Sequence, residues 1–352
     1  MNEKLKIGII FGGNSSEAEV SLAGGRNVYN NFDLTRYQPI ALYWDKNFRF
    51  WEIPETLIIR NTTKEIEDRL EKFAKRIFYE DLAKSIDLAF LVTHGKYGDD
   101  GCLQGLLELL NVPYTGSGVL SCASGMDKGM QRKFMEQYGG INVPKYKVIH
   151  LSDWQLNESQ IRKMIEKEFS FPCVIKPTRE GSTFGVTVVK SQADLAKAID
   201  EAAFYDNEML VESYLRGREF SCIVIGNDEP WAFLPTETIH SGEIFSYDDK
   251  YLPGASNKIT PMEVEEEIIK EIQKQSILTF RALNCKNYAR IDGFVVSSKV
   301  YITDPNSAAS TGMGPSSWTF HQAAKAGMSI KEFLSKLIDL ALESQRNKKG
   351  PL

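Results

Sequence analysis

The N-terminal third of the chain alternates between strand-like and helix-like segments, and this alternation limits the fold more than any other feature. Residues Leu5–Phe11 form an apolar strand pattern that runs into Gly12-Gly13, and the apolar spacing after it predicts a helix over 20–29. Strands that alternate with helices form parallel sheets covered by helices on both faces. This part of the chain therefore predicts an α/β domain with a mostly parallel sheet. Its further expected segments are a strand at 38–44, a charged helix at 63–75 and a buried strand at 86–93.

A different pattern begins where a helix is expected to end at Gly139-Gly140 and a strand to begin at Lys145. A small α+β unit follows. Beyond Glu219 the strands are expected to pair as antiparallel hairpins across turns at 226–228 and 297–298. The expected segments are a helix at 191–202 and strands at 171–177, 186–190, 208–212, 220–225, 232–236, 290–296 and 300–304.

These changes of pattern, together with the motifs described below, predict three domains. We expect an N-terminal α/β substrate-binding domain over 1–123, a central unit over 124–212 and a C-terminal unit over 213–352. The polar stretch 241–261 is long for a loop inside a compact domain, and such loops are usually functional. We therefore expect a mobile loop at 241–261 that closes over a site.

The composition excludes several classes of function. The 352 residues carry a formal net charge of -5, from 47 acidic and 42 basic side chains, so no nucleic-acid polymer is expected as a partner. Apolar runs stay far below the roughly 20 residues that cross a membrane, and the first one is too short for a signal peptide. The five cysteines include no CxxC pair, which argues against a zinc site or a redox dithiol. Scattered cysteines in apolar context suit a reducing compartment, so we expect a cytoplasmic protein.

The strongest local motif is KPTREGSTFG at residues 176–185. A lysine at the end of a strand precedes a loop bracketed by glycines, whose backbone N–H groups could close over phosphate oxygens. Lys176 would then act as a point charge beside the phosphates. A plain hairpin with a solvated lysine is the alternative. Because neither GxxxxGK[ST] nor GxGxxG occurs, a nucleotide would not be bound by a P-loop or a dinucleotide fold.

A second motif joins Arg290-Ile-Asp292 to Asp304-Pro-Asn306 across an expected hairpin. Residues two apart on a strand share a face, so Arg290 and Asp292 point the same way. Two carboxylates and an amide oxygen are ligands of the kind that Mg²⁺ takes beside nucleotide phosphates. An adjacent arginine would stabilise negative charge that develops on a transferring group. The alternative is a structural salt bridge between Arg290 and Asp304.

Two polar loops follow strands of the N-terminal domain, at residues 12–17 and 93–101. Open α/β sheets bind ligands at the carboxyl ends of their strands, where such loops lie. Glu17 could receive an amine there, or it could serve only as an acid at the start of a helix. His94 could likewise be functional or structural.

Taken together and in this order, these segments resemble the D-alanine–D-alanine ligases of the ATP-grasp superfamily, over nearly the whole chain. The resemblance implies an ATP-grasp fold behind the N-terminal α/β domain. It also implies a homodimeric enzyme that joins small amino acid substrates for peptidoglycan precursor synthesis. The stretches that carry it are GGNSSEAEVSL, the block from His94 to Lys128, KPTREGSTFGV, VESYLRGREF, YDDKY, RIDGF and AGMS.

The resemblance also implies which side chains bind ATP and magnesium. The phosphates would lie near two lysines beneath the glycine-bracketed loop, and the adenine and ribose near the segment 212–219. The positions implied for ATP are Lys128, Lys176, Glu180, Thr183, Glu212, Leu215, Glu219 and Lys250. Those implied for two Mg²⁺ ions, or for Mn²⁺ in their place, are Asp292, Asp304 and Asn306.

The substrate positions follow from the same resemblance. Glu17 would receive the ammonium group of the first amino acid, assisted by Ser182 and Tyr251. ATP would convert the carboxylate of this amino acid to an acyl phosphate, which the amine of the second amino acid would attack. Arg290 and a backbone N–H near Gly312 would stabilise the resulting oxyanion. The remaining substrate positions are His94, Ser317 and Trp318.

The chain departs from the family pattern near the second-substrate pocket. Asp304 stands where the family has a glutamate that is one methylene longer, and Trp318 stands where a smaller apolar residue is common. The loop before Gly312 is also longer than usual. A misplacement of roughly 1 Å in a reacting geometry can cost about 100-fold in rate. These departures therefore leave the acceptor and the efficiency of catalysis open.

Three functions remain compatible with the sequence. The first is an active D-alanine–D-alanine ligase, and the second is an ATP-grasp ligase that uses a different acceptor amine. The third is a nucleotide-binding homologue with weak or no catalysis. Tyr251 favours an amino acid acceptor, because a phenylalanine at this position accompanies ligases that use D-lactate.

Overall fold

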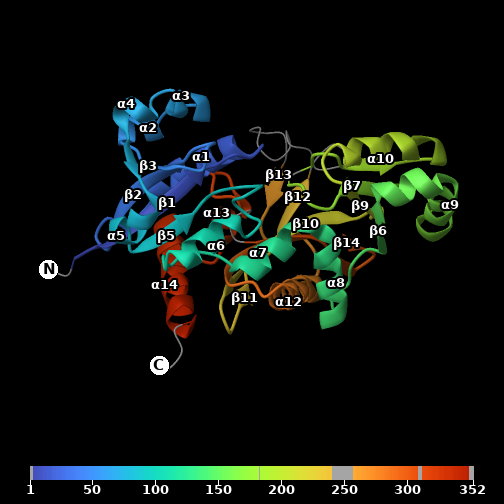
Figure 1. Cartoon of the computed structure of the whole chain (residues 1–352). Helices are drawn as coiled ribbons and strands as arrows, with labels where there is room; N and C mark the ends of the chain where they lie inside the picture. The colour runs from blue at the N-terminus through green and yellow to red at the C-terminus, as the bar shows by residue number, and fades with distance from the viewer. Residues whose placement is uncertain (1–2, 182, 240–256, 308–310, 349–352) are drawn as a thin grey trace.

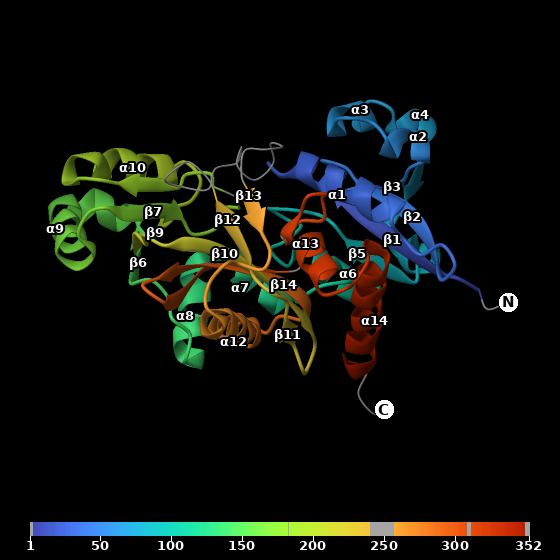
Figure 2. The same ribbon diagram turned by 180° about the vertical axis from the view of Figure 1, so that it is seen from behind.

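The structure is a computed structural model of the chain, and it describes residues 3–181, 183–239, 257–307 and 311–348. Within these ranges the strands form three sheets. The first sheet occupies one end of the molecule, the third sheet the other end, and the second lies between them (Figures 1 and 2).

The first sheet is mixed, with the order β4-β3-β2-β1-β5. Strand β1 (Leu5–Gly12) pairs in parallel with β2 (Tyr37–Trp44) and β5 (Leu88–Leu91), which confirms the parallel core of the predicted domain. The short strands β3 (Phe50–Glu52) and β4 (Lys75–Ile77) continue the sheet with antiparallel pairing. The prediction missed both, because three residues are too few for a period-two pattern to be recognised.

The helices around this sheet follow the prediction in part. Helix α1 (Ala18–Asn30) follows β1 as expected. The expected helix at 63–75 is wrong in its length, because it consists of α3 (Thr63–Glu67) and α4 (Leu70–Phe73) and gives way to β4. The other elements here are α2 (Glu55–Ile58), the 3₁₀ turn Tyr79–Asp81, α5 (Leu82–Ser85), α6 (Cys102–Leu109) and α7 (Val119–Met126).

The third sheet confirms the predicted central α+β unit. Helix α8 (Lys128–Tyr138) precedes it and ends at Gly139, as expected. Its strands pair antiparallel in the order β6-β9-β7-β8, and Ile165, Ile199 and Val211 belong to its own apolar core. Its elements are β6 (Tyr146–His150), α9 (Leu151–Phe169), β7 (Cys173–Pro177), β8 (Thr187–Val189), the 3₁₀ turn Gln192–Asp194, α10 (Leu195–Ala203) and β9 (Glu208–Ser213).

The second sheet is antiparallel, with the order β13-β12-β10-β14-β15 and β11 paired to β10. Ser297 and Ser298 both have positive φ and form the predicted turn between β14 and β15. The predicted strand at 232–236 is split into β11 and β12, because Pro235 has no N–H group for the ladder. The strands are β10 (Arg218–Gly226), β11 (Trp231–Ala232), β12 (Thr236–Ile239), β13 (Asn257–Ile259), β14 (Asn287–Val296) and β15 (Lys299–Ser307).

The predicted loop at 241–261 needs a correction at its C-terminal end. Residues Asn257–Ile259 form β13, which pairs with β12, so this part is a strand and not a loop. The pairing gives the backbone of β13 hydrogen-bond partners that a loop would lack. Residues 240–256 lie outside the described part of the chain.

The second sheet shares an apolar core with the first. Helices α13 (Trp318–Lys325) and α14 (Ile330–Lys348) carry Phe320 and Phe333, which belong to one buried cluster with Phe11 of β1 and Ile223 of β10. Helix α12 (Glu266–Ala282) and α8 contribute to a separate cluster with β10, β14 and β15. The first two sheets are thus joined through apolar packing. The division of the chain at residues 123 and 212 stays a prediction.

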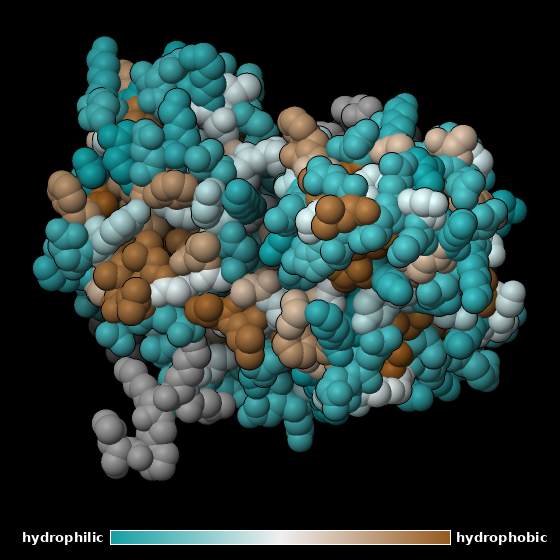
Figure 3. Space-filling model, turned by 45° about the vertical axis from the view of Figure 1, so that its right-hand side comes forward, coloured by the Kyte–Doolittle hydropathy of each residue, from teal (hydrophilic) through white to brown (hydrophobic). Residues whose placement is uncertain are grey.

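No helix in the described ranges is long and apolar enough to cross a bilayer. The face in Figure 3 is mostly hydrophilic, and its hydrophobic side chains gather in several separate patches. Four cysteines are buried, namely Cys122, Cys173, Cys222 and Cys285.

Close packing of α1 on β1 gives a test of the fold. A Cβ atom added at Gly25 would collide with the buried ring of Phe11. We expect Gly25→Ala to lower the free energy of unfolding by about 1–3 kcal/mol. The matched control is Gly105→Ala in α6, where the nearest atom would be 3.9 Å away. This change should raise stability by roughly 0.5–1 kcal/mol, because alanine is the better helix former. Denaturant unfolding measures the free energy of unfolding of both variants. Equal effects of the two changes would contradict the close packing of α1 on β1 at Gly25.

Candidate active site

Two adjoining cavities lie within the described residues and hold most of the predicted site positions. The larger has a volume of about 910 Å³ and lies between the second and third sheets. The smaller, of about 360 Å³, lies beside the loops that follow β1 and β5. Both are lined by Lys128, Arg290, Asp304 and Trp318. These four side chains therefore form the boundary between the two cavities.

The larger cavity has apolar walls on two sides. Val174 and Val188 come from the third sheet, Val186 directly precedes its strand β8, and Phe294 comes from β14 of the second sheet. Leu215 lines the cavity between β9 and β10, where the chain passes from one sheet to the other. A slot bounded by apolar side chains on two sheets suits a flat aromatic ring system. Polar predicted positions also line this cavity, namely Lys176, Thr183, Glu212 and Glu219.

A cluster of buried charges lies at the inner wall of this cavity. The ammonium Nζ of Lys176 is 2.6 Å from Oε1 of Glu212, and Nη2 of Arg132 is 3.0 Å from Oε2 of the same carboxylate. Burial acts to raise the pKa of Glu212, but the charges of Lys176 and Arg132 outweigh it and hold this pKa below its ordinary value. Glu212 is therefore an anion shared between two cations.

Lys128 lies under the glycine-bracketed loop. Its Nζ donates to the backbone carbonyl of Glu180 at 2.7 Å, and its backbone N–H donates to Thr178. Asp127 caps α8 by accepting the N–H of Met130, so the lysine lies at the first position of the helix. Burial and the nearby charge of Glu17 raise the pKa of Glu180. Ser182, in the same loop, lies outside the described residues.

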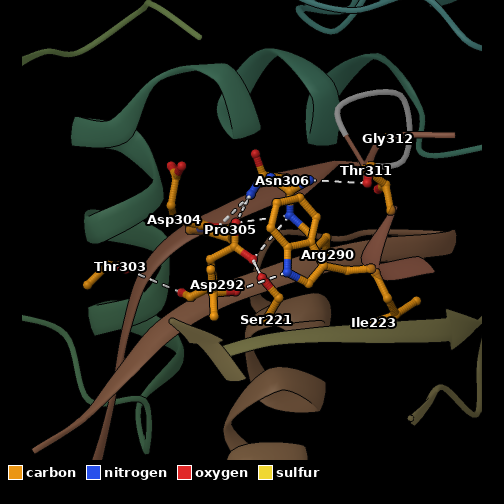
Figure 4. Close-up of polar contacts among 12 residues, drawn as sticks. Ser221, Ile223, Arg290, Asp292, Thr303, Asp304, Pro305, Asn306, Thr311 and Gly312 are labelled. Carbon is orange, nitrogen blue, oxygen red and sulfur yellow. Dashed lines mark hydrogen bonds and ion pairs between the residues drawn. The ribbon is translucent and has the colours of Figure 1, made fainter. Parts of the chain in front are cut away.

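The hairpin of β14 and β15 presents the second motif on one face. Asp292 is paired directly with Asp304, and Arg290 with Asn306. Nε of Arg290 lies 3.1 and 3.0 Å from the two carboxylate oxygens of Asp292, and the hydroxyl of Ser221 donates to the same carboxylate at 2.6 Å (Figure 4). Arg290 thus forms an ion pair with Asp292, two residues further along β14.

The donor set on this face fits a hard divalent cation. Burial raises the pKa of Asp292, and the charge of Asp304 adds to the rise against the opposing effect of Arg290, so a cation would relieve the repulsion. Nδ2 of Asn306 donates to Asp292 at 2.9 Å, and the amide would have to turn for its oxygen to bind a metal. No cluster of three His, Cys, Asp or Glu metal ligands occurs in the described part of the chain. The two carboxylates thus suit Mg²⁺, which takes its remaining ligands from water and phosphate.

The smaller cavity has a carboxylate and a neutral histidine at one end. Glu17 precedes α1 and is buried, and a Cβ atom added at Gly181 would lie 2.5 Å from its Oε2. Nδ1–H of His94 donates to the carbonyl of Val92 at 3.0 Å, so the deprotonated Nε2 is left as an acceptor. Burial lowers the pKa of His94. Nε2 is buried and has no hydrogen-bond partner among the described residues.

The start of α13 also lines this cavity. The buried hydroxyl of Ser317 has no hydrogen-bond partner in the described ranges, and Gly312 lies beside it in the lining. The indole N–H of Trp318 donates to Thr238 at 3.0 Å, which fixes the ring at the boundary of the two cavities. The ammonium of Lys258 lies 4.2 Å from the centre of this ring and donates to the carbonyl of Ser316.

Sequence reasoning missed three of these polar residues. Arg132 lies four residues after Lys128, which is one helical turn, and this spacing was a usable signal. Ser221 lies two residues after Glu219 on β10, and only strand pairing brings it to Asp292. Lys258 lies in the stretch that was expected to be a loop. Lys250 and Tyr251 fall in residues 240–256, outside the described part.

Comparisons with known proteins show the family of the chain. Family models described as D-ala D-ala ligase N-terminus and D-ala D-ala ligase C-terminus match residues 6–117 and 135–339. The D-alanine–D-alanine ligase of Natranaerobius thermophilus is 33% identical, with 98% of this chain and 97% of the relative covered. That of Geobacillus thermodenitrificans is 34% identical at the same coverage of both chains. The chain belongs to the D-alanine–D-alanine ligase family.

Solved structures support the same assignment. The VanG D-Ala:D-Ser ligase of Enterococcus faecalis superposes with a TM-score of 0.84 at 30% identity, covering 96% of this chain and 100% of that one. The D-alanine–D-alanine ligase of Coxiella burnetii gives 0.83 at 28% identity, covering 99% and 96%. The family assignment confirms the predicted ATP-grasp fold, and the chain is an ATP-dependent ligase.

The buried histidine of this ligase gives a test in the form of a pH dependence. His94 has a lowered pKa when folded, so the unfolded chain takes up a proton below pH 6.5 that the folded chain resists. The stability that His94 contributes is present above pH 6.5 and is lost as the pH falls below it. The loss approaches about 1.4 kcal/mol per pH unit for one proton.

We expect His94→Gln to flatten the decline of the unfolding free energy between pH 6.5 and 5, as measured by urea unfolding. His150→Gln serves as the control, because this change removes an exposed histidine outside both cavities. If the unfolding free energies of the wild type and His94→Gln fell in parallel with pH, the lowered pKa of His94 would be contradicted.

Proposed function

We propose that this ligase joins two D-alanine molecules with ATP as the energy source, by way of a D-alanyl phosphate. The observation that carries the proposal is the boundary shared by the two cavities. One cavity has the size and apolar walls for a nucleotide, the other is lined by a buried carboxylate and a buried serine, and Arg290 lines both. A phosphoryl group and an amino acid carboxylate would meet at this boundary.

ATP would lie in the larger cavity. Its adenine would pack between the valines of the third sheet and Phe294, beside Leu215 and Glu212, and Glu219 would bind the ribose. Its phosphates would extend toward Lys128 and Lys176 beneath the loop that carries Glu180 and Thr183. Both lysines are buried, so their charges are poorly screened by solvent.

Asp292, Asp304 and Asn306 would hold two Mg²⁺ ions, and Mn²⁺ could take their place. Bound there, the metal would neutralise the charge that spreads over the transferring phosphoryl group. The protein supplies the two carboxylates from directly paired positions of one hairpin. The carboxylate of Asp292 is held in place by hydrogen bonds from Ser221 and Arg290.

The two amino acids would occupy the smaller cavity. Glu17 would bind the ammonium group of the first, with help from Ser182 and Tyr251, and the neutral Nε2 of His94 could accept a further hydrogen bond from it. Ser317 would bind the carboxylate of the second amino acid at the start of α13, where the helix dipole favours an anion. Trp318 would leave space only for a small side chain.

The reaction then takes place in two steps. An oxygen of the first carboxylate attacks the γ-phosphorus of ATP, which forms the acyl phosphate and releases ADP. The deprotonated amine of the second D-alanine attacks the acyl carbon, and the dipeptide forms as inorganic phosphate leaves. Arg290 and a backbone N–H near Gly312 would stabilise the oxyanion between these events. Arg290 is held for this role by Asp292 and by the carbonyl of Thr311.

The dipeptide would serve peptidoglycan precursor synthesis in the cytoplasm, and we propose that the enzyme is a homodimer. The large ring of Trp318 between the cavities fits the small side chain of D-alanine as the second substrate.

The deciding experiment is ATP-dependent phosphate release across D- and L-amino acids and hydroxy acids, with the product mass determined. We expect D-alanine alone to give the highest rate and a product of the mass of D-alanyl-D-alanine. A mixed dipeptide formed faster with another amine would assign a different acceptor. If none of the amino acids in the panel supported phosphate release, the proposal would be overturned.

The short carboxylate of the hairpin gives a second test. Asp304→Asn keeps the shape of the side chain and removes its charge, so we expect kcat to fall by about 100-fold with little change in stability. Asp304→Glu keeps the charge and gives the side chain the length that the family usually has. This variant should retain activity at a comparable magnesium concentration. Equal rates for the wild type and Asp304→Asn, in assays across a magnesium series, would remove Asp304 from the metal site.

A further inference from the structure

Arg132 is the largest fully buried side chain of the described residues, and it lines neither cavity. It lies on α8, one turn after Lys128. Its exposed fraction is 0%, so it cannot touch a bound nucleotide. Burying a guanidinium is costly unless its charge and its N–H groups are matched. The burial of Arg132 therefore needs a physical explanation.

The hydrogen bonds of Arg132 match only part of its donors. Nη2 donates to Glu212 at 3.0 Å and to the carbonyl of Thr303 at 2.6 Å. Nε and Nη1 are buried without a hydrogen-bond partner in the described part of the chain. An unmatched buried donor lowers stability, so a side chain selected only for stability would be apolar here.

Charge balance around Glu212 gives Arg132 a role in the site. Lys176 and Glu212 alone would form a neutral pair, and the positive charge facing the larger cavity would be cancelled. Arg132 adds a second cation to the same carboxylate, so the cluster of Lys176, Glu212 and Arg132 carries a net charge of +1. The ammonium of Lys176 then remains attractive to an anion in the cavity.

The second contact of Arg132 reaches the hairpin. The pairing of β14 with β15 shifts register between Asp292 and Gly293, so that Thr303 is the extra residue of a bulge beside Asp304. The carbonyl of Thr303 accepts from Arg132, and the carbonyl of Pro305 accepts from Gln131 at 3.0 Å. Helix α8 therefore holds β15 on both sides of Asp304.

We propose that Arg132 is a positioning residue for the polyphosphate of ATP. It acts through Glu212, which it shares with Lys176, and so keeps a net positive charge beside the phosphates without touching them. Through Thr303 it also fixes the strand that presents Asp304. This inference rests on the proposed function, because it assumes that the larger cavity binds ATP.

The test compares the affinities for ATP and adenosine, measured by calorimetry at fixed salt and magnesium concentrations without amino acids. A unit charge at a partly screened site is worth on the order of tenfold in affinity. We expect Arg132→Met to weaken ATP binding by about tenfold and to leave adenosine binding unchanged. The ratio of the two affinities is the readout, because only ATP carries phosphate charge.

A rescue separates charge from structure. Adding Glu212→Gln to Arg132→Met removes the anion that cancels Lys176, so the ratio of ATP to adenosine affinity should return toward that of the wild type. Arg132→Lys keeps the charge, so its ratio of ATP to adenosine affinity should stay close to that of the wild type. The matched control is Lys133→Met, which removes an exposed cation from the same helix and should leave the ratio unchanged.

The outcomes distinguish this inference from the proposed function. A wild-type chain that does not bind ATP would overturn both. If the wild type binds ATP and Arg132→Met leaves the ratio of ATP to adenosine affinity unchanged, only the role of Arg132 would be overturned. A loss that Glu212→Gln fails to rescue would overturn the role of Arg132 in the charge balance at Glu212. Thermal unfolding of each variant would report directly whether such a loss comes from damage to the fold.

Discussion

The pairing of β14 with β15 is the constraint on which the site depends. Antiparallel pairing sets Asp292 opposite Asp304 and Arg290 opposite Asn306, so that four polar side chains share one face. Chain connectivity alone would leave these residues in two separate segments. The other parts of the site are arranged around this face, with the nucleotide-sized cavity on one side and the smaller cavity on the other.

The three sheets are attached to this hairpin by different kinds of interaction. The first sheet shares an apolar core with β10, α13 and α14, so the ends of β1 and β5 are fixed relative to the hairpin by packing. The third sheet has a core of its own, and it meets α8 through Lys128 and through the shared carboxylate of Glu212.

The sequence predicted those parts whose signal is local. The hairpin with its turn at Ser297-Ser298, helix α1 and the lysine of β7 followed from alternation, glycines and motif spacing. The strands β3 and β4 were too short to give a pattern. The apolar residues at 232–236 predicted one strand, but Pro235 divides this segment between β11 and β12. Ser221 and Arg132 enter the site through pairing and packing between distant segments. Such contacts depend on the register of strands and on the direction of a helix, which a single sequence does not display.

The aspartate at position 304 shows how backbone and side chain share the task of placing a charge. Because an aspartate is one methylene shorter than a glutamate, its carboxylate follows the backbone more closely and has fewer rotatable bonds with which to correct an error. The backbone here bulges at Thr303, and the carbonyls on both sides of Asp304 accept hydrogen bonds from α8. Pro305 limits the same segment further, since its ring fixes φ. A backbone held at Thr303 and at Pro305, on both sides of Asp304, can do for a short side chain what length and flexibility do for a longer one.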